Sequence, residues 1–423
     1  MREKNTQKAR KRKYPLNQIY FYLTEGCNLR CRHCWISPKY QSEGSSYPTL
    51  DLNLFRSIID QAKPLGLSGV KLTGGEPLLH PEIQSILEFV QREGFDLTVE
   101  TNGALCTSEL ARKIAVCKSP FVAVSLDGTD AETHEWVRGV PGCFDDALAG
   151  IRNLVIQGLK PQIIMTIMRR NKDQMEDLVQ LAESLGAGSV KFNILQPTAR
   201  GEKMHNDGET LAIEELVELG RWVENTLSAS TRLRVVYGHP MAFRPLGKMF
   251  GNDRDGCGVC GILGILGVLG DGSYALCGIG ETVPELVFGH SAKDRLEEVW
   301  RETPVLLELR DEFPHSLEGI CGDCLMRYRC LGGCVAQNYY RKKNIWAAFW
   351  YCEKAQRQGL FPKSRVATRR LHEPQMDPAF GTPQYPSNKR VEAKIYRTNF
   401  SFPTGERTNP QDPGIPGPRY SES

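Results

Sequence analysis

The chain has 423 residues, of which 40% are hydrophobic, and this length suffices for one large and one smaller domain with buried cores. Its net charge is +3, but residues 1–13 hold seven Lys/Arg and one Glu, so the remainder carries −3, which argues against a broad nucleic-acid-binding face. No run of eighteen apolar residues occurs, and no apolar segment follows the basic N-terminus, so we expect neither a membrane span nor a signal peptide, and a cytoplasmic protein.

Short β-branched or aromatic runs alternate with amphipathic stretches between residues 18 and 230, a pattern typical of βα units around a parallel sheet. The predicted strands are Gln18–Leu23, Gly69–Leu72, Asp96–Glu100, Phe121–Leu126, Gln162–Met168 and Ser189–Leu195. The motifs TEGC, TGGEP, TNG and SLDG lie at the ends of the first four strands. Because loops after the strands form the active face of β/α barrels, we expect these motifs to converge in a partial six-unit α/β barrel.

The expected domain organisation follows from shifts in composition along the chain. We expect a basic disordered tail at 1–15, the barrel at 16–235, a linker at 236–256, a small cysteine-rich α+β domain at 257–362, and a disordered tail at 363–423. The last segment is polar, with nine prolines between Pro374 and Pro418. Such a composition buries too little apolar surface to offset its ordering entropy.

Fourteen cysteines make their spacing the main evidence about function, because clustered cysteines in a reducing cytosol more often bind metal or take part in catalysis than form disulfides. Cys27, Cys31 and Cys34 follow the first predicted strand with the spacing Cys-x3-Cys-x2-Cys. Three thiolates on a tight loop can bind three irons of a [4Fe–4S] cube and leave the fourth iron open for a cosubstrate. The alternative is a zinc site, which normally takes four protein ligands when it is structural.

This spacing, with Trp35 directly after the third cysteine and GGEP downstream, closely resembles the radical SAM superfamily. By this resemblance, Cys27, Cys31 and Cys34 hold the radical-generating [4Fe–4S] cluster, which binds S-adenosylmethionine (SAM). One-electron reduction of SAM then gives methionine and a 5′-deoxyadenosyl radical that takes a hydrogen atom from the substrate. The protein has to position the substrate and exclude side reactions.

The resemblance also implies a set of SAM-binding residues. The GGEP glycines let the backbone approach the ligand, Glu76 offers a counter-charge for the SAM ammonium, and polar side chains hold the ribose and carboxylate. The implied set is Gly74, Gly75, Glu76, Pro77, Ser125, Asp127 and Arg138. Asp127 equally suits a turn before a glycine. Asn102 in TNG is left outside the set.

Eight further cysteines lie between residues 257 and 352, at Cys257, Cys260, Cys277, Cys321, Cys324, Cys330, Cys334 and Cys352. The Gly272-x4-Cys277 step and the following CxxC-x5-C-x3-C run resemble the SPASM extension of radical SAM peptide-modifying enzymes. This resemblance implies two auxiliary [4Fe–4S] clusters. One would be held by Cys257 or Cys260, or both, with Cys277 and Cys334, and the other by Cys321, Cys324, Cys330 and Cys352. A pair of zinc sites is the alternative.

The two resemblances together predict a radical SAM oxidoreductase that modifies a ribosomally synthesised peptide. Residues 257–289 and 330–365 look most like the maturases assigned to thio(seleno)oxazole-type, or selenobiotic, peptides. The expected partners are a precursor peptide and an electron donor such as flavodoxin or ferredoxin, with no membrane and no nucleic acid.

Two alternatives stay open. An anaerobic sulfatase maturase, which oxidises Cys or Ser to formylglycine, would need an acidic base, and Asp271 is the nearest candidate, although it equally suits a turn between strands. A non-enzymatic iron–sulfur scaffold or electron carrier is the other. A carrier would not need the set formed by Glu76, Ser125 and Arg138.

Overall fold

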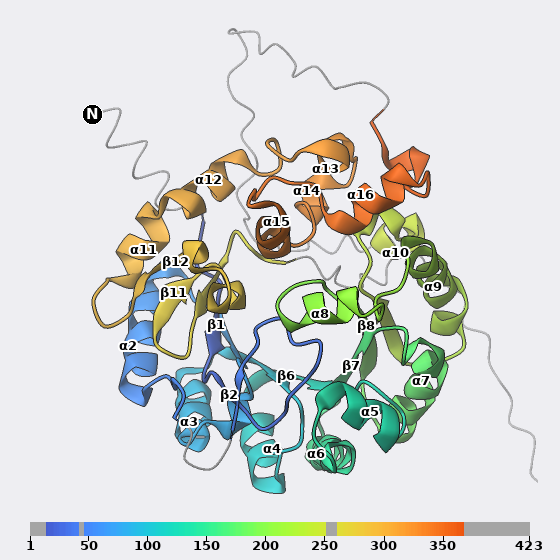
Figure 1. Ribbon diagram of the computed structural model, residues 1–423. Coiled ribbons are helices and arrows are strands. Elements are labelled where there is room, and N and C mark those ends of the chain that lie inside the picture. The colour runs from blue at the N-terminus through green and yellow to red at the C-terminus, as the bar shows by residue number, and fades with distance from the viewer. Residues whose placement is uncertain (1–13, 42–45, 251–259, 368–423) are drawn as a thin grey trace, which may run out of the picture. The chain divides into compact units, whose positions relative to one another are not determined.

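The computed structural model describes residues 14–41, 46–250 and 260–367, and these contain one large sheet (Figure 1). The strands follow the order β12-β11-β10-β1-β4-β5-β6-β7-β8-β9, and all neighbours from β10 to β9 are parallel. The strands are β1 (Gln18–Tyr22), β4 (Gly69–Thr73), β5 (Asp96–Thr101), β6 (Lys118–Ser125), β7 (Gln162–Ile167), β8 (Ser189–Ile194), β9 (Arg234–Tyr237), β10 (Ile265–Val268), β11 (Ser273–Ala275) and β12 (Val287–His290).

All six predicted barrel strands are present, in the predicted order, and the α/β partial barrel is confirmed. The structure adds β9 at one edge and β10 at the other. β10 pairs in parallel with β1, with Gln18 opposite Ile265. The cysteine-rich half of the chain therefore extends the barrel's own sheet.

Helices surround the barrel strands in Figure 1 because each has one apolar face. They are α2 (Leu52–Ala62), α3 (Ile83–Glu93), α4 (Ser108–Ala115), α5 (Ala131–Arg138), α6 (Cys143–Ile156), α7 (Met175–Ser184) and α9 (Ile213–Asn225). The short helix α8 (Arg200–Asn206) lies inside this ring, where the Arg200 amide donates to the Cys34 carbonyl at 3.2 Å. In α2 the buried positions include Phe55, Ile58 and Ile59, and Asp51 caps the helix by accepting from two backbone amides. The helix therefore begins where the sequence supplies a cap.

The two faces of the barrel strands differ in chemistry. Outward-facing residues such as Val70, Leu72 and Phe192 are fully buried in the main hydrophobic core. Their neighbours along the strands, such as Thr73 and Lys191, line a cavity on the inner face. The polar inner face leaves room for a ligand where many β/α barrels are filled by branched apolar side chains.

The cysteine-rich half adds the antiparallel strands β11 and β12 and a series of short helices. The helices are α11 (Leu296–Glu302), α12 (Pro304–Glu312), α13 (Gly319–Asp323), α14 (Arg327–Cys330), α15 (Val335–Lys342) and α16 (Trp350–Arg357). α11 packs next to α2, where the Leu296 amide donates to the Gln61 side chain at 3.0 Å. The predicted α+β character of this half is confirmed.

Segments expected to be tails or a linker carry structure at three places. Tyr14 donates to the Arg310 carbonyl at 2.6 Å, so the ordered chain begins before residue 16. The expected linker at 236–256 contains the end of β9, a 3-10 helix at Met241–Phe243 and α10 (Leu246–Phe250). Val366 forms a β-bridge with Cys324, so the folded part extends beyond residue 362. Residues 1–13 and 368–423 of the two expected tails lie outside the described residues.

Candidate active site

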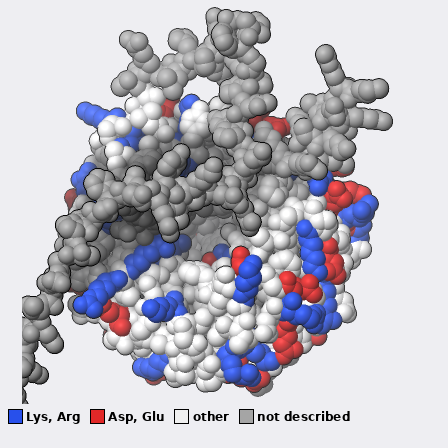
Figure 2. Space-filling model, turned by 180° about the vertical axis from the view of Figure 1, so that it is seen from behind, with Lys and Arg blue, Asp and Glu red and all other residues white. Residues whose placement is uncertain are grey.

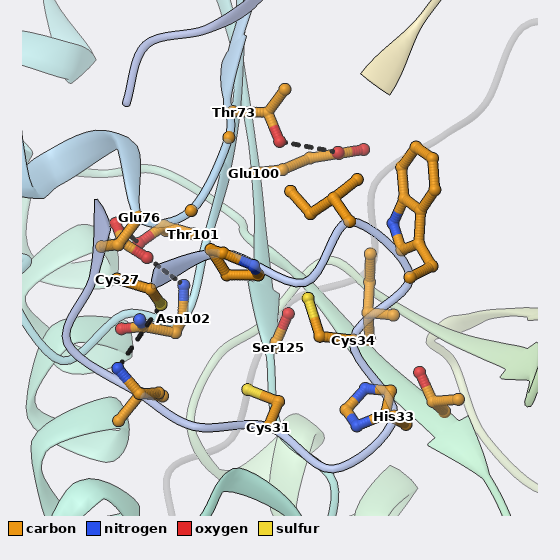
Figure 3. A pocket seen from close by; sticks show the side chains of 18 of the residues that line it. Cys27, Cys31, His33, Cys34, Thr73, Glu76, Glu100, Thr101, Asn102 and Ser125 are labelled. Carbon is orange, nitrogen blue, oxygen red and sulfur yellow. Dashed lines mark hydrogen bonds between the residues drawn. The ribbon is translucent and has the colours of Figure 1, made fainter. Parts of the chain in front are cut away.

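A loop between β1 and α2 carries the first three cysteines into a cavity of about 230 Å³. The loop includes the paired two-residue strands β2 (Gly26–Cys27) and β3 (Lys39–Tyr40). Its backbone is fixed to the end of α5, where the amides of Arg30 and Arg32 each donate at 2.9 Å to carbonyls of Arg138 and Val137. In Figure 3 the loop crosses the view, and the side chains of Cys31 and Cys34 point from it toward the middle of the cavity.

The GGEP motif packs directly against this loop. The amides of Gly75 and Glu76 donate to the carbonyls of Thr24 and Gly26 at 2.9 and 3.0 Å. A Cβ at Gly75 would lie 1.9 Å from the Gly26 carbonyl oxygen, which explains the glycine. Gly74 has a φ of 131°, a conformation that side chains disfavour. The GGEP motif thus sets the position of the cysteine loop.

Glu76 is almost fully buried and connects two strands at the wall of the cavity. Its carboxylate accepts from the Thr101 hydroxyl at 2.6 Å and from the Asn102 backbone amide at 2.8 Å (Figure 3). It also accepts from the Leu78 backbone amide at 3.1 Å. Burial raises its pKa, although these hydrogen bonds oppose the rise. A cationic group in the cavity would favour the carboxylate form.

Arg138 lines the cavity from the end of α5, while Asp127 holds it from behind. Their side chains form an ion pair at 2.7 Å, and the Arg138 Nη1 lies 3.5 Å from the Cys31 sulfur. Burial tends to raise the pKa of Asp127, but Arg138 and His33 outweigh it and lower that pKa. Asp127 is fully buried and does not line the cavity, so a direct contact with SAM is not supported.

The structure brings most of the predicted site residues together. The expected residues that line the cavity are Cys27, Cys31, Cys34, Gly74, Gly75, Glu76, Ser125 and Arg138. Pro77 does not line it and instead begins a short 3-10 helix. The residues that sequence reasoning missed include His33, Thr73, Glu100, Asn102, Lys191 and Asn193. For Thr73, Glu100, Lys191 and Asn193 the available signal was their alternation with buried apolar residues along the strands.

The donor set fits a [4Fe–4S] cluster and SAM. Burial raises the pKa of Cys27 and raises that of Cys34 to about 11, so iron binding would displace thiol protons. Within the described ranges, no three His, Cys, Asp or Glu side chains converge on a single ion. A cube bonds each thiolate to a different iron, so it needs no such convergence. The buried Arg138 Nε and His33 Nδ1 have no hydrogen-bond partner in the described chain, which leaves them available to a polar ligand.

The later cysteines fall into two groups according to which thiols influence one another. Burial, and after it Cys334, raises the pKa of Cys260 to about 12. Burial raises the pKa of Cys277, and Cys334 and Cys260 add to the rise. The first group is therefore Cys260, Cys277 and Cys334. Cys257 belongs to the part of the chain that is not described.

The second group comprises Cys321, Cys324, Cys330 and Cys352. Cys321 and Cys352 share a hydrogen bond that raises the pKa of Cys352 and lowers that of Cys321. Burial, with contributions from Cys321 and Cys324, raises the pKa of Cys330 to about 11. These four thiols come from α13, α14, α16 and the connection after α13.

A second cavity of about 180 Å³ lies between the barrel and the later cysteines. It is lined by Cys260, Cys330 and Cys334, and on the barrel side by His239 and Arg244. Both halves of the chain thus line one cavity.

Asp271 lies in the hairpin between β10 and β11, exposed to solvent. Its carboxylate accepts from the amide and the hydroxyl of Ser273 at 2.8 and 2.9 Å, and its carbonyl is 2.9 Å from His290 Nε2. It lines neither cavity. These contacts favour the turn interpretation over a catalytic base.

The surface charge and the hydropathy of the helices bear on whether the protein binds nucleic acid or spans a membrane. Figure 2 shows Lys/Arg and Asp/Glu side chains interspersed over the described part of the face in view. Such a mixture does not favour nucleic-acid binding. None of the helices in the described residues is long and apolar enough to span a membrane.

Comparisons with known proteins agree with this geometry. The model of the radical SAM superfamily matches residues 21–182. An AdoMet-dependent heme synthase of Methanosarcina barkeri is 30% identical over 332 residues, covering 76% of this chain and 91% of that protein. The mycofactocin maturase MftC of Mycobacterium tuberculosis is 29% identical over 324 residues, covering 75% of this chain and 78% of that protein.

A solved structure extends the similarity to most of the fold. SuiB of Streptococcus suis bound to S-adenosylmethionine has a TM-score of 0.64 at 18% identity, covering 83% of this chain and 81% of that one. SuiB has also been solved with its precursor peptide SuiA. This likeness shows the fold, and the heme synthase shows the family. The chain therefore belongs to the radical SAM superfamily, and it is an enzyme that uses a [4Fe–4S] cluster and S-adenosylmethionine.

Proposed function

We propose that this enzyme oxidatively modifies a ribosomally synthesised peptide in the cavity lined by the first three cysteines. Cys27, Cys31 and Cys34 hold the radical-generating cluster in this proposal. The support is that all three thiols line one cavity with Glu76 and Arg138, whose charges suit the ammonium and the carboxylate of SAM.

A cluster held by Cys27, Cys31 and Cys34 would supply the electron for cleavage of SAM to methionine and a 5′-deoxyadenosyl radical, which would take a hydrogen atom from the substrate. The chain's own residues bind and orient. Glu76 receives the SAM ammonium, Ser125 offers a hydroxyl to the ribose, and Arg138, fixed by Asp127, pairs with the carboxylate. Partial enclosure of the cavity limits access of water to a reactive intermediate. A reduced flavodoxin or ferredoxin is the proposed electron donor.

Two auxiliary [4Fe–4S] clusters are proposed in the cysteine-rich half. One would be held by Cys277 and Cys334 together with Cys260, Cys257 or both, and the other by Cys321, Cys324, Cys330 and Cys352. The separation of the described thiols into a group of three and a group of four supports this assignment. These clusters would remove the electron left on the substrate after hydrogen abstraction, which suits an oxidation.

The observation that carries the peptide assignment is this pair of thiol groups beside a barrel that resembles a solved peptide-bound enzyme. SuiB binds the precursor peptide SuiA, and MftC is named a mycofactocin maturase. The narrower proposal is a thio(seleno)oxazole-type precursor, based on the likeness of residues 257–289 and 330–365. A sulfatase-maturase role is not favoured, because the contacts of Asp271 are those of a turn.

A second candidate substrate is an iron tetrapyrrole. The observation behind it is the similarity to the heme synthase of M. barkeri, because the alignment with this chain covers 91% of that protein. Heme-type tetrapyrroles carry carboxylates on flexible arms, as peptides can, so the two substrate classes share one kind of anchoring group.

The test is anaerobic reconstitution with iron and sulfide, followed by incubation with SAM, a reductant and a candidate substrate. The candidates are the short peptides encoded next to the gene and iron coproporphyrin III, a tetrapyrrole that appears in the name of another relative, the Fe-coproporphyrin III synthase of M. barkeri, which is 30% identical over 200 residues. We expect about twelve irons per chain, together with a mass change on a peptide that requires SAM and releases 5′-deoxyadenosine. Conversion of the porphyrin without conversion of any peptide would replace the proposal with the second candidate.

A further inference from the structure

Lys191 is a charged residue on the inner face of the barrel that has no role in the function proposed above. It lies in the middle of β8, between Val190 and Phe192, which are fully buried in the main core. Because side chains alternate along a strand, Lys191 faces the other way, and it lines the cavity. It is in register with Ile164 of β7, which in turn is in register with Ser125 of β6, and all three line the cavity.

The other charged groups of this cavity have partners, whereas Lys191 does not. The Glu100 carboxylate forms an ion pair with Lys71 and accepts from Thr73, as Figure 3 shows for Thr73. Arg138 forms its pair with Asp127. Lys191 makes no hydrogen bond or ion pair with any residue in the described ranges. Lys191 is partly buried, and an ammonium in this position without a partner is destabilised by lost hydration, which a bound anion would offset.

The charges around Lys191 define the ligand further. Burial lowers its pKa, Glu100 raises it, and Lys71 and Arg244 lower it. Two of these three neighbours are cations, and Glu100 is already paired with Lys71. An arriving anion would therefore meet net positive charge. A cationic substrate group would be repelled from the same place.

The position of Lys191 separates it from the part of the cavity assigned to SAM. β8 lies five strands away from β1 in the sheet, so it is on the wall opposite the strand that precedes the cysteine loop. Arg244, which influences Lys191, lines the second cavity together with Cys260 and Cys334. Lys191 is therefore on the side of the first cavity that faces the later cysteines.

We propose that Lys191 binds a carboxylate of the substrate and thereby positions the substrate carbon that faces SAM. This inference rests on the proposed function only in that the substrate enters this cavity. In a peptide the carboxylate is either the C-terminus or the side chain of Asp or Glu. In a tetrapyrrole it is one of the carboxylate arms.

The test compares the reconstituted wild-type enzyme with Lys191→Met, which removes the charge, and Lys191→Arg, which keeps it. Lys118→Met serves as the control, because Lys118 is also on a barrel strand but pairs with Asp96 and is more than half exposed. The substrates are the peptide from the neighbouring gene, the same peptide with an amidated C-terminus, and forms with Asp and Glu changed to Asn and Gln. The measurements are KM, kcat, SAM affinity and substrate-free SAM cleavage.

We expect Lys191→Met to raise KM for the unmodified peptide by about tenfold to a hundredfold, with a smaller change in kcat. Lys191→Arg restores much of this loss, and Lys118→Met behaves like wild type. One of the neutralised peptides should be a poor substrate for the wild type, and its KM should not change further in Lys191→Met. The carboxylate missing from that peptide is then the one that Lys191 binds. Substrate-free SAM cleavage should change by less than about twofold, a change too small to indicate a lost contact.

Three results would overturn the inference. The first is an equal effect of Lys191→Met on the acidic and all neutralised peptides. The second is a loss of SAM affinity in Lys191→Met, which would assign the lysine to the carboxylate of SAM. If no peptide is converted, the proposed function fails, and iron coproporphyrin III and its methyl ester are titrated instead. The inference would then be supported if the wild type preferred the free acid to the methyl ester and Lys191→Met lost this preference. The third overturning result is equal binding of the free acid by the wild type and by Lys191→Met.

Discussion

The two halves of the chain bring their thiols together in different ways. In the barrel, Cys27, Cys31 and Cys34 come from one short loop whose backbone is fixed by the GGEP motif and by α5. In the other half, Cys260 and Cys277 flank a hairpin of the sheet, and Cys334 directly precedes α15. A local group can be recognised from spacing alone, whereas a dispersed group depends on the fold that assembles it.

The strongest test of this contrast removes one thiol from the local group. Cys31→Ala should abolish SAM cleavage and lower the iron content from about twelve to about eight per chain, because the cluster loses one of three protein ligands. Iron analysis and 5′-deoxyadenosine release measure both effects. Cys117→Ala is the control, since Cys117 is buried outside both cavities. Unchanged cleavage in Cys31→Ala would contradict the assignment of the loop.

Removing a thiol from the dispersed group sharpens the comparison. Cys334→Ala should lower the iron content by about four and stop product formation, while SAM cleavage without substrate continues. Separate assays of 5′-deoxyadenosine and of modified product distinguish the two. If Cys334→Ala and Cys31→Ala had the same effect on substrate-free cleavage, the halves would not act independently.

The contact between the cysteine loop and GGEP is testable at Gly75. A methyl group there would clash with the Gly26 carbonyl oxygen and displace the loop. We expect Gly75→Ala to slow SAM cleavage by about a hundredfold, as a misplacement of about 1 Å can do, and to destabilise the fold by about 1–3 kcal/mol. Gly247→Ala is matched to it, because an added Cβ there meets nothing within 4 Å. Activity of Gly75→Ala near that of wild type would show that the loop tolerates movement.

The smallest expected effect concerns the junction of the two halves. Glu224 accepts from His239, which lines the second cavity, and pairs with Lys248 at 3.0 Å. Burial tends to raise the pKa of Glu224, but these partners outweigh it and lower that pKa to about 2. Glu224→Gln should reduce the free energy of unfolding near neutral pH by about 1–3 kcal/mol.

The pH dependence of that effect follows from the direction of the shift. Because the pKa of Glu224 is lower in the folded state, its contribution is present above its ordinary value of 4.5 and is lost as pH falls toward 2. Chemical denaturation of wild type and Glu224→Gln at several pH values measures the difference. If the difference in free energy of unfolding between wild type and Glu224→Gln did not become smaller as the pH falls, this account would be contradicted.

Sequence reasoning found the barrel because each of its strands lies between clear turn signals and amphipathic helices. It suggested a turn between two strands at Asp271 but did not place the first of them, β10 (Ile265–Val268), beside β1 in the barrel's sheet. All four residues of β10 are buried, and Gly267 could not carry a side chain, since a Cβ there would lie 2.8 Å from the Cys277 backbone. This glycine is therefore required by close packing in the sheet.

The candidate site was predictable where motifs are local and was not where partners come from separate elements. The three cysteines and Glu76 were identified by spacing. The pairing of Asp127 with Arg138 was not, because one residue follows β6 and the other ends α5. Lys191 was missed for a related reason: a lysine within a strand is chemically informative only once the inner face of the barrel is known.

The pairing of β1 with β10 has a consequence for the order of events during synthesis. Ile19 lies opposite Leu266, about 250 residues later in the chain, so one edge of β1 stays open until most of the protein has been made. An open strand edge is a template for unwanted pairing with other chains. The loop with the first three cysteines follows this strand directly. Incomplete chains would expose both the unpaired edge of β1 and the three thiols. We therefore expect the cluster to be inserted after the whole chain has been synthesised.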